Sequence, residues 1–330
     1  ERLTLVGASG VRLYDSDPIV ADKESDEVVV GSATPCVHVV TLPDPLEATL
    51  ARAAGVECFG DLEALPELDL CIKGLAQLPA CLGRLSALER LELDDNNLTE
   101  LPESICHGLV SLEELHLVSN QLRALPNSFG SLPCLRELYL GENHLVALPE
   151  SICELATMVR LDLRDNQLVS LPERFGQLTG LRGVVLNYNQ LTELPQSFGQ
   201  LAALEEAHLV GNYLTSLPES FGQLLALQVL FLSENLLEAL PNTFGNLAAL
   251  LHLHLESNCL TELPDNFGQL VLLQDVDLEK NRLSAWPESF ERLVALHLRD
   301  VNLRWNPITM PLEEGGCLAR GHGCGQRHGS

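Results

Sequence analysis

Two histidines and three acidic residues toward the C-terminal end have the residue types of a zinc site. His252 and His254 lie one residue apart, as do Asp275 and Asp277, and 23 residues separate each histidine from its aspartate. On two adjacent strands these side chains would share one face, about 5 Å apart, with Glu256 nearby. Histidine beside aspartate is commoner on recognition surfaces than in metal sites, so we expect no bound metal and no cofactor. The carboxylates would instead favour the charged imidazolium, which predicts binding that depends on pH near neutrality.

A second group of possible zinc ligands lies in the C-terminal tail, at Cys317, His322, Cys324 and His328. The intervals between these residues match no common zinc-binding spacing. We therefore expect an unstructured terminus here, again without metal.

The sequence contains two partial catalytic motifs, and neither is complete. Gly7-Ala8-Ser9-Gly10 is followed by no Gly-Lys-Ser/Thr, so it is no phosphate-binding loop. His297-Leu298-Arg299-Asp300 is similar to part of a kinase catalytic loop, but no glycine-rich loop or Asp-Phe-Gly accompanies it. We expect no enzyme activity.

The elements that must position these residues recur at a constant interval. Leu-x-x-Leu-x-Leu-x-x-Asn-x-Leu-x-x-Leu-Pro is repeated along the chain, as from Leu250 to Pro264. Leu-x-Leu indicates a short strand with one face turned inward, and a constant interval brings each strand beside the next, parallel and in register. One repeat cannot bury its leucines alone, so the repeats must stack. The asparagines are spaced by 23 residues from Asn120 to Asn281, and the full set is Asn96, Asn120, Asn143, Asn166, Asn189, Asn212, Asn235, Asn258, Asn281 and Asn306.

These repeats resemble the leucine-rich repeat superfamily over about residues 65–308. The 23-residue period and the segment Leu194-Pro195-Gln196-Ser197-Phe198-Gly199-Gln200-Leu201 are similar to its intracellular Ras-group or Shoc2-like subclass. The resemblance implies an α/β solenoid, or horseshoe, of eleven repeats. A parallel β-sheet would form the concave face, and short loop or 3-10 segments the convex face. The resemblance also implies a protein partner, such as a small GTPase, a phosphatase or another signalling protein.

The asparagines are expected to be structural. Where each strand ends, backbone N–H and C=O groups lose their sheet partners, and an asparagine amide offers both donors and an acceptor. Phenylalanine also recurs in one slot, which predicts a stacked spine under the convex side. Most of these phenylalanines precede a glycine, which suits close backbone approach or a positive φ. The spine consists of Phe129, Phe175, Phe198, Phe221, Phe244, Phe267 and Phe290, with Ile105 and Ile152 in two repeats.

Alternation along each strand predicts which side chains face solvent on the concave side. One outward column has acidic ends and an aromatic and apolar middle. It contains Asp69, Glu92, His116, Tyr139, Asp162, Val185, His208, Phe231, His254, Asp277 and Asn302. Neighbouring columns add Val229 and His252 on one side, and Tyr188, Val210 and Ser233 on the other.

Exposed apolar and aromatic residues on a preformed sheet are typical of a binding hot spot. We therefore predict that a protein partner binds on the concave face. The residues expected to contact it are Tyr139, Val185, Tyr188, His208, Val210, Val229, Phe231, His252, His254 and Asp277.

The net charge and the cysteine positions limit which partners and which cellular compartment we expect. The 46 acidic and 20 basic residues give a net charge of −26, which opposes nucleic acid and favours a partner with a basic surface. The sequence has no run of about eighteen apolar residues that would indicate a membrane span. Its ten cysteines are scattered and form no clustered caps, so we expect reduced thiols and a cytoplasmic location.

Both ends of the chain depart from the repeat. Residues 1–64 contain extended runs at Val28–Val30 and Val37–Val40 and a helix from about Pro45 to Ala54, which predicts an N-terminal cap over the first strand. Lys73 takes the first ladder position in place of asparagine. The last interval, from Asn281 to Asn306, is 25 residues. We therefore place the eleven repeats at 65–308 and a glycine-rich tail at 309–330.

Two functional interpretations remain. The chain is a non-catalytic protein–protein interaction scaffold of intracellular signalling, or it is the recognition segment of a larger protein. Such a larger protein could be a receptor with this chain in its ectodomain, or an effector enzyme that reads its substrate through it.

Overall fold

The structure, a computed structural model, describes residues 45–56, 59–296 and 298–308, and the backbone of five short strands before them. The chain divides into two compact units, Glu1–Phe59 and Gly60–Ser330. The possible tail ligands Cys317, His322, Cys324 and His328, and the segment 7–10, lie outside the described residues.

The first unit contains antiparallel strands and one helix. Strands β1 (Leu3–Val6) and β2 (Val11–Tyr14) pair with each other. Strands β3 (Ile19–Ala21), β4 (Val28–Val30) and β5 (His38–Val39) form a three-stranded sheet. Helix α1 spans Pro45–Ala54. Strands β4 and β5 and helix α1 therefore lie where the sequence predicts extended runs and a helix, while the capping role of residues 1–64 stays a prediction.

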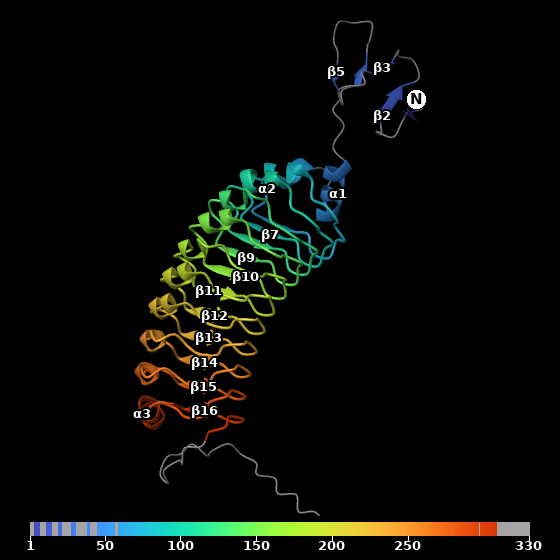
Figure 1. Cartoon of the computed structure of the whole chain (residues 1–330). Coiled ribbons are helices and arrows are strands. Elements are labelled where there is room, and N and C mark those ends of the chain that lie inside the picture. Colours follow the sequence, from blue (N-terminus) through green and yellow to red (C-terminus); the bar gives the residue numbers. More distant parts are fainter. Residues whose placement is uncertain are drawn as a thin grey trace, which may run out of the picture. The chain divides into compact units, whose positions relative to one another are not determined.

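The second unit is built on one parallel sheet of eleven strands that follow each other in sequence order (Figure 1). Neighbouring strands pair without a shift, so that His208 lies beside Phe231 and Phe231 beside His254. The predicted solenoid, with the sheet on its concave face, is confirmed. The strands are β6 (Glu67–Asp69), β7 (Arg90–Glu92), β8 (Glu114–His116), β9 (Glu137–Tyr139), β10 (Arg160–Asp162), β11 (Gly183–Val185), β12 (Glu206–His208), β13 (Val229–Phe231), β14 (His252–His254), β15 (Asp275–Asp277) and β16 (Asp300–Asn302).

Short helical segments stack on the other side of the repeats, as the sequence predicts (Figure 1). Two of them are α-helices, α2 (Glu103–Gly108) and α3 (Glu288–Leu296). The 3-10 segments are η1 (Phe59–Leu62), η2 (Ala80–Arg84), η3 (Phe129–Ser131), η4 (Glu150–Glu154), η5 (Phe175–Gln177), η6 (Gln196–Gln200), η7 (Glu219–Gln223), η8 (Phe244–Asn246) and η9 (Phe267–Gln269).

The phenylalanine spine runs beneath these helical segments. Phe175, Phe198 and Phe221 are fully buried, and their rings stack with centroids 6.0 and 5.9 Å apart. A Cβ on the glycine that follows, for example Gly199, would collide with the carbonyl oxygen of Ser220 in the next repeat. Close backbone approach therefore requires the glycine. The alternative of a positive φ is wrong at this slot, because the positive-φ glycines of the described chain are Gly55, Gly74 and Gly211.

The buried asparagines form the predicted hydrogen-bonded ladder. The Asn143 amide nitrogen donates to the carbonyl oxygen of Leu140 in its own repeat and to that of Leu117 in the preceding one, at 3.1 and 2.8 Å. Its amide oxygen accepts from the backbone N–H of Leu122 at 3.0 Å. Each such amide therefore ties the backbone of one repeat to the repeat before it.

A left-handed residue precedes each ladder position, which the sequence did not predict. Glycine occupies this place once, at Gly211 with φ +68°. Elsewhere the position holds a residue with a Cβ, at φ between 53 and 59°: Ile72, Asp95, Ser119, Glu142, Asp165, Tyr188, Glu234, Ser257, Lys280 and Trp305. Such a conformation costs an L-residue roughly 1–2 kcal/mol, so the ladder hydrogen bonds hold a strained turn in every repeat.

Candidate functional site

Three aromatic rings from neighbouring strands meet on the concave face. Phe231 on β13 lies between His208 on β12 and His254 on β14. The Phe231 ring stacks on His254 at 4.5 Å and 26°, and meets the edge of His208 at 4.9 Å and 79°. All three side chains are partly exposed. We call these three residues the aromatic triad.

Apolar residues surround the aromatic triad, as the sequence predicts. Val229 lies on the same strand as Phe231 and pairs with His252, while Val185 pairs with His208. Val210, just past β12, is also partly exposed. The strand register therefore brings these predicted contact residues together, and the sheet fixes their relative positions.

Tyr139 and Asp162 belong to other local clusters of the column. The Tyr139 ring stacks on His116 at 4.5 Å, and its hydroxyl donates to Glu137. Burial, together with this carboxylate, raises the pKa of Tyr139 to about 12. Asp162 was expected to be exposed and is instead buried. It accepts a hydrogen bond from the backbone N–H of Arg164 at 3.0 Å, and the Arg164 guanidinium lies 3.3 Å from its carboxylate.

Two expectations for the column that contains Val210 need correction, namely the exposure of Ser233 and the position of Tyr188. Ser233 is buried at 4% exposure and presents no surface to a partner. Tyr188 is exposed, but it occupies the left-handed position at the turn, one residue beyond the Val210 column. Its ring lies so close to Gly211 that a Cβ there would stand 2.5 Å from a ring carbon. Alternation along a strand no longer applies at these positions, because the strands end after three residues.

The two histidines of β14 have different partners. Nδ1 of His252 lies 2.6 Å from Oδ2 of Asp275, while the His254 ring stacks on Phe231. Asp277 accepts hydrogen bonds from the Asn302 amide at 3.0 Å and from the backbone N–H of Glu279 at 2.8 Å. These side chains are therefore engaged with separate neighbours rather than gathered around one point. The pH dependence of binding stays a prediction.

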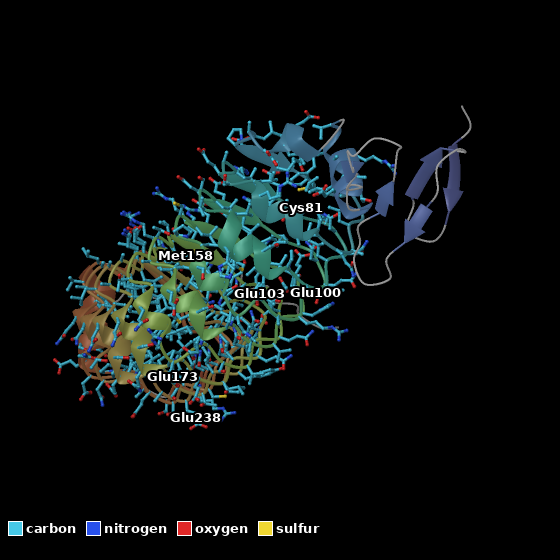
Figure 2. All side chains as sticks on the ribbon, turned by 90° about the horizontal axis from the view of Figure 1, so that it is seen from above. Cys81, Glu100, Glu103, Met158, Glu173 and Glu238 are labelled. Carbon is cyan, nitrogen blue, oxygen red and sulfur yellow. The ribbon has the colours of Figure 1, made fainter. Side chains whose placement is uncertain are left out.

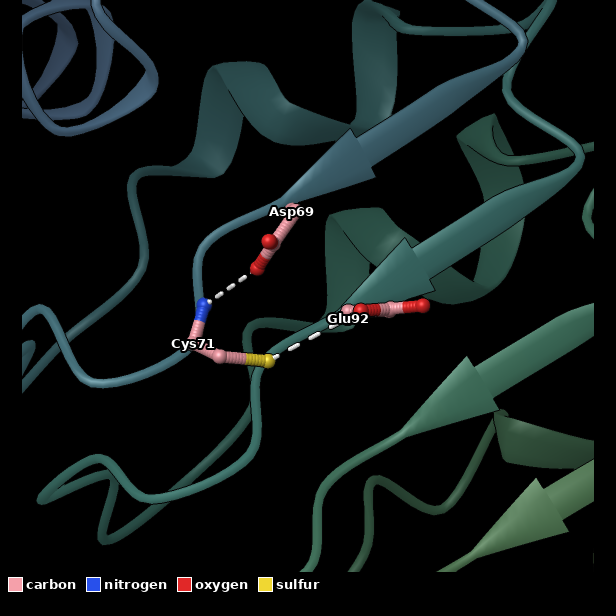
Figure 3. A group of neighbouring side chains, drawn as sticks. All are labelled: Asp69, Cys71 and Glu92. Carbon is pink, nitrogen blue, oxygen red and sulfur yellow. Dashed lines mark hydrogen bonds between the residues drawn. The ribbon is translucent and has the colours of Figure 1, made fainter.

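The described residues contain one group whose ligand atoms lie close enough to share a metal ion, formed by Asp69, Cys71 and Glu92 (Figure 3). The backbone N–H of Cys71 donates to Asp69 at 2.9 Å, and its Sγ lies 4.0 Å from Glu92. Burial and the hydrogen bond to Asp69 raise the pKa of the Cys71 thiol to about 11. The thiol is therefore protonated at neutral pH, and a metal ion that bound here would have to displace this proton. Sequence reasoning missed this group, although the repeat period places Cys71 and Glu92 on adjacent turns.

Burial also acts on His208. It lowers the pKa of the imidazole, while the nearby Glu206 and Asp162 carboxylates act in the opposite direction. His208 therefore contributes a neutral ring to the aromatic triad at neutral pH.

Acidic side chains occupy both ends of the concave face. Arg90 bridges Glu92 and Glu114 near the first end, at 2.7 and 2.8 Å, and leaves an excess of negative charge there. Basic residues near the middle are Arg160 and Arg164. The acidic residues are Glu67, Asp69, Glu92, Asp94, Glu114 and Glu137 toward the N-terminal end, and Glu256, Asp275, Asp277, Glu279 and Asp300 toward the C-terminal end.

The structure also describes most of the cysteines and the helices. The described cysteines Cys71, Cys106, Cys134, Cys153 and Cys259 form no disulfide bond. In the described part of the chain, no helix has both the length and the apolar character that crossing a bilayer requires.

Comparison with known sequences identifies the repeats. The sequence profile of the family described as "Leucine rich repeat" matches residues 86–145, 156–214 and 208–260. No curated protein sequence matches the chain significantly.

Solved structures with the same architecture include plant and bacterial proteins. The ectodomain of the plant membrane receptor kinase GASSHO1/SCHENGEN3 from Arabidopsis thaliana, in complex with CASPARIAN STRIP INTEGRITY FACTOR 2, is 31% identical with a TM-score of 0.65. The match covers 74% of this chain and 30% of the receptor chain. The plant peptide hormone receptor RGFR1, in complex with RGF2, is 28% identical with a TM-score of 0.64, over 73% of this chain and 40% of the receptor. The functional domain of InlJ from Listeria monocytogenes shares the fold at 20% identity and a TM-score of 0.60, over 80% and 60% of the two chains.

The chain thus spans less than half of the length of these two plant receptor chains.

Proposed function

This chain belongs to the leucine-rich repeat family, and from that premise we propose that it is a non-catalytic interaction module that binds a protein partner on its concave face. The observation that carries the proposal is the aromatic triad, a partly exposed cluster of rings held on a continuous sheet. Aromatic residues on a rigid surface contribute large contact area at little cost in conformational entropy. RGFR1 is described as a peptide hormone receptor and was solved in complex with RGF2, which supports recognition of a polypeptide.

The expected partner has a basic surface. Acidic residues stand at both ends of the concave face and the chain carries a net charge of −26, so lysines and arginines of a partner would be attracted on either side of the apolar centre. This distribution favours a partner that lies along the sheet, with an apolar segment on the aromatic triad and basic residues on both sides.

We further propose an intracellular role as a signalling scaffold, in the 23-residue Ras-group or Shoc2-like subclass. The repeat length and the lack of disulfide bonds among the described cysteines support this assignment. By that resemblance, the partner would be a small GTPase, a phosphatase or another signalling protein. Residues 1–64 would cap the first repeat, and residues 309–330 would form a tail.

The alternative is that the chain is the recognition segment of a larger protein. The coverage of the plant receptors favours it, because the matched region is 30–40% of those chains. The full-length sequence would distinguish the two roles.

Affinity capture with matched variants tests the concave face. The full chain, a Phe231→Ala/His254→Ala variant and a Val146→Ala/Val169→Ala control would be compared by quantitative mass spectrometry. The control residues are exposed apolar side chains between a ladder asparagine and the next helical segment, away from the sheet. We expect proteins that bind the wild type and the control but not the aromatic variant. Equal recovery by all three would contradict the proposal.

A titration with the purified partner then measures how much Phe231 contributes to the binding free energy. Phe231→Ala should weaken binding by at least about 1 kcal/mol, roughly fivefold, with little change in the thermal unfolding midpoint. The affinity should also fall as salt is raised, because the charge attraction is screened. An affinity that the substitution leaves unchanged would exclude Phe231 from the interface.

A further inference from the structure

A hollow in the turns beside the concave face brings two carboxylates next to an aromatic ring. Its volume is about 600 Å³, it is open to solvent, and it extends over three consecutive repeats. The exposed residues that border it are Glu142, His144, Asp165, Gln167 and Tyr188, and we call this site the turn hollow. Lys and Arg are absent from its border.

The backbone holds three of these side chains in one row. Glu142, Asp165 and Tyr188 occupy the left-handed position of successive turns. The backbone N–H of Glu142 donates to the carbonyl oxygen of Arg164 at 2.9 Å. That of Asp165 donates to the carbonyl oxygen of Asn187, also at 2.9 Å. The turns therefore stay paired in register past the ends of the strands, which spaces neighbours in the row by about 5 Å.

The Tyr188 ring is held in place by the glycine of the next turn. A Cβ at Gly211 would stand 2.5 and 2.8 Å from two carbons of the ring, so the ring lies directly against the Gly211 backbone. Gly211 follows Tyr188 by one repeat and Asp165 precedes it by one, so the ring stands between the glycine and the carboxylates. Tyr188 is 52% exposed, and a ring fixed in this way offers a ligand a surface that is already ordered.

The two carboxylates have no positive neighbour. In the part of the chain that the structure describes, neither Glu142 nor Asp165 forms a salt bridge. Carboxylates also project from many other parts of the repeats, as at Glu103, Glu173 and Glu238, and do not mark a site by themselves (Figure 2). The turn hollow differs because its two carboxylates adjoin a fixed aromatic ring.

This combination suits the guanidinium of an arginine side chain. A guanidinium is planar and carries several N–H donors, so it can stack on an aromatic ring while it donates to carboxylates beside the ring. The Ser119 hydroxyl donates to one Glu142 oxygen at 2.9 Å and leaves the other oxygen for a ligand. A lysine ammonium would meet the same charge, but it lacks the planar face.

We propose that the turn hollow binds an arginine side chain of the protein partner, with the guanidinium on the Tyr188 ring and its N–H groups donating to Glu142 and Asp165. This inference rests on the proposed function, since the arginine belongs to the partner that lies along the concave face. Asp165 follows closely after β10, which ends at Asp162, so a partner on the sheet can reach the turn hollow. The site therefore specifies one basic residue of that partner and the place where it binds.

A blocked arginine, Nα-acetyl-L-arginine amide, tests the site without a partner. Backbone amide NMR of the full chain should show saturable shifts confined to the turns around Asp165 and Tyr188, with a dissociation constant on the order of a few millimolar. The corresponding blocked lysine should bind at least roughly threefold more weakly, because it cannot stack on the ring as a plane. Blocked citrulline has a similar shape without the charge and should give no saturable shift.

Two variants remove the two parts of the site. Asp165→Asn removes the charge and keeps a residue type that tolerates left-handed backbone, while Tyr188→Leu keeps an apolar side chain without the aromatic face. Each should weaken binding of the blocked arginine at least about threefold. The matched controls are Asp95→Asn, at an exposed left-handed aspartate of an earlier turn, and Tyr213→Leu, at a tyrosine 54% exposed outside the turn hollow. Both should bind as the wild type does.

Several results would overturn the proposal. They are shifts that are absent, shifts that spread over the whole acidic surface, binding that persists in either Asp165→Asn or Tyr188→Leu, and equal binding of arginine with lysine or citrulline. Such a failure would concern the turn hollow alone, because the probe contains no partner sequence. The concave face is tested separately, through the Phe231→Ala/His254→Ala variant.

Discussion

At the scale of single residues, His208 gives the fold a dependence on pH. Burial holds the pKa of this imidazole below its ordinary value of 6.5, so between the two values the unfolded chain binds the proton and the folded chain does not. The contribution of His208 to stability is therefore complete above about pH 6.5 and declines as the pH falls toward the folded pKa. His208→Gln should remove this part of the decline.

Chemical denaturation of wild type and variant across this range measures the effect. His144→Gln, at an exposed histidine, serves as the control and should retain the wild-type slope. Parallel pH profiles for His208→Gln and wild type would show that the His208 imidazole is not the group responsible.

Gly211 gives a second prediction at this scale. It has φ +68°, and a Cβ would also press against the ring of Tyr188 at 2.5 Å. Gly211→Ala should therefore destabilise the protein by about 1 kcal/mol or slightly more, because the strain exceeds the entropy that alanine removes from the unfolded chain. In a Tyr188→Ala background the cost should be smaller. A cost that does not change in that background would mean that φ alone determines it.

The sequence predicted the positions of strand residues on the concave face more accurately than the positions of turn residues. The alternation of side chains placed Val185, His208, Phe231 and His254 correctly, because strand geometry has a period of two. It misplaced Tyr188, because the left-handed turn begins directly after the strand. Gly211 at the same position in the next repeat was the available signal.

At the scale of elements, the asparagine ladder predicts that each turn stabilises the turn before it. Asn189 donates to the carbonyl oxygens of Leu163 and Leu186 at 2.9 and 3.1 Å, and accepts from the backbone N–H of Leu168 at 3.0 Å. Asn189→Ala leaves these buried groups without partners and should cost about 1–3 kcal/mol. Equilibrium urea unfolding would measure the loss.

The neighbouring Gln190→Ala is the matched control. Gln190 is exposed, so its substitution should change the free energy of unfolding by less than about 0.5 kcal/mol. Equal values for the two variants would mean that water replaces the Asn189 amide at no cost.

At the scale of the whole molecule, the second unit could be predicted because each turn contacts its neighbours in the same way. Leucine, asparagine and phenylalanine positions all repeat in one register, so local and global signals agree. Contacts outside that register could not be predicted. The burial of Asp162 depends on Arg164, and the Asp69, Cys71 and Glu92 group depends on side-chain rotamers of adjacent turns.

Because each ladder asparagine bonds to the preceding turn, the ladder affects how such a chain can lengthen. The amide of Asn212 binds the carbonyl of Leu186 and the N–H of Leu191 in the preceding turn, and Asn235 repeats the pattern with Leu209 and Leu214. In an inserted copy of one repeat, the backbone groups would bond to the asparagine of the turn that follows. The asparagine of the inserted copy would bond to the backbone of the turn before it. Gene duplication can therefore extend this protein without new compensating substitutions. The longer turn before Asn306 keeps the ladder as well, because its amide still accepts from the backbone N–H of Leu283 at 3.0 Å.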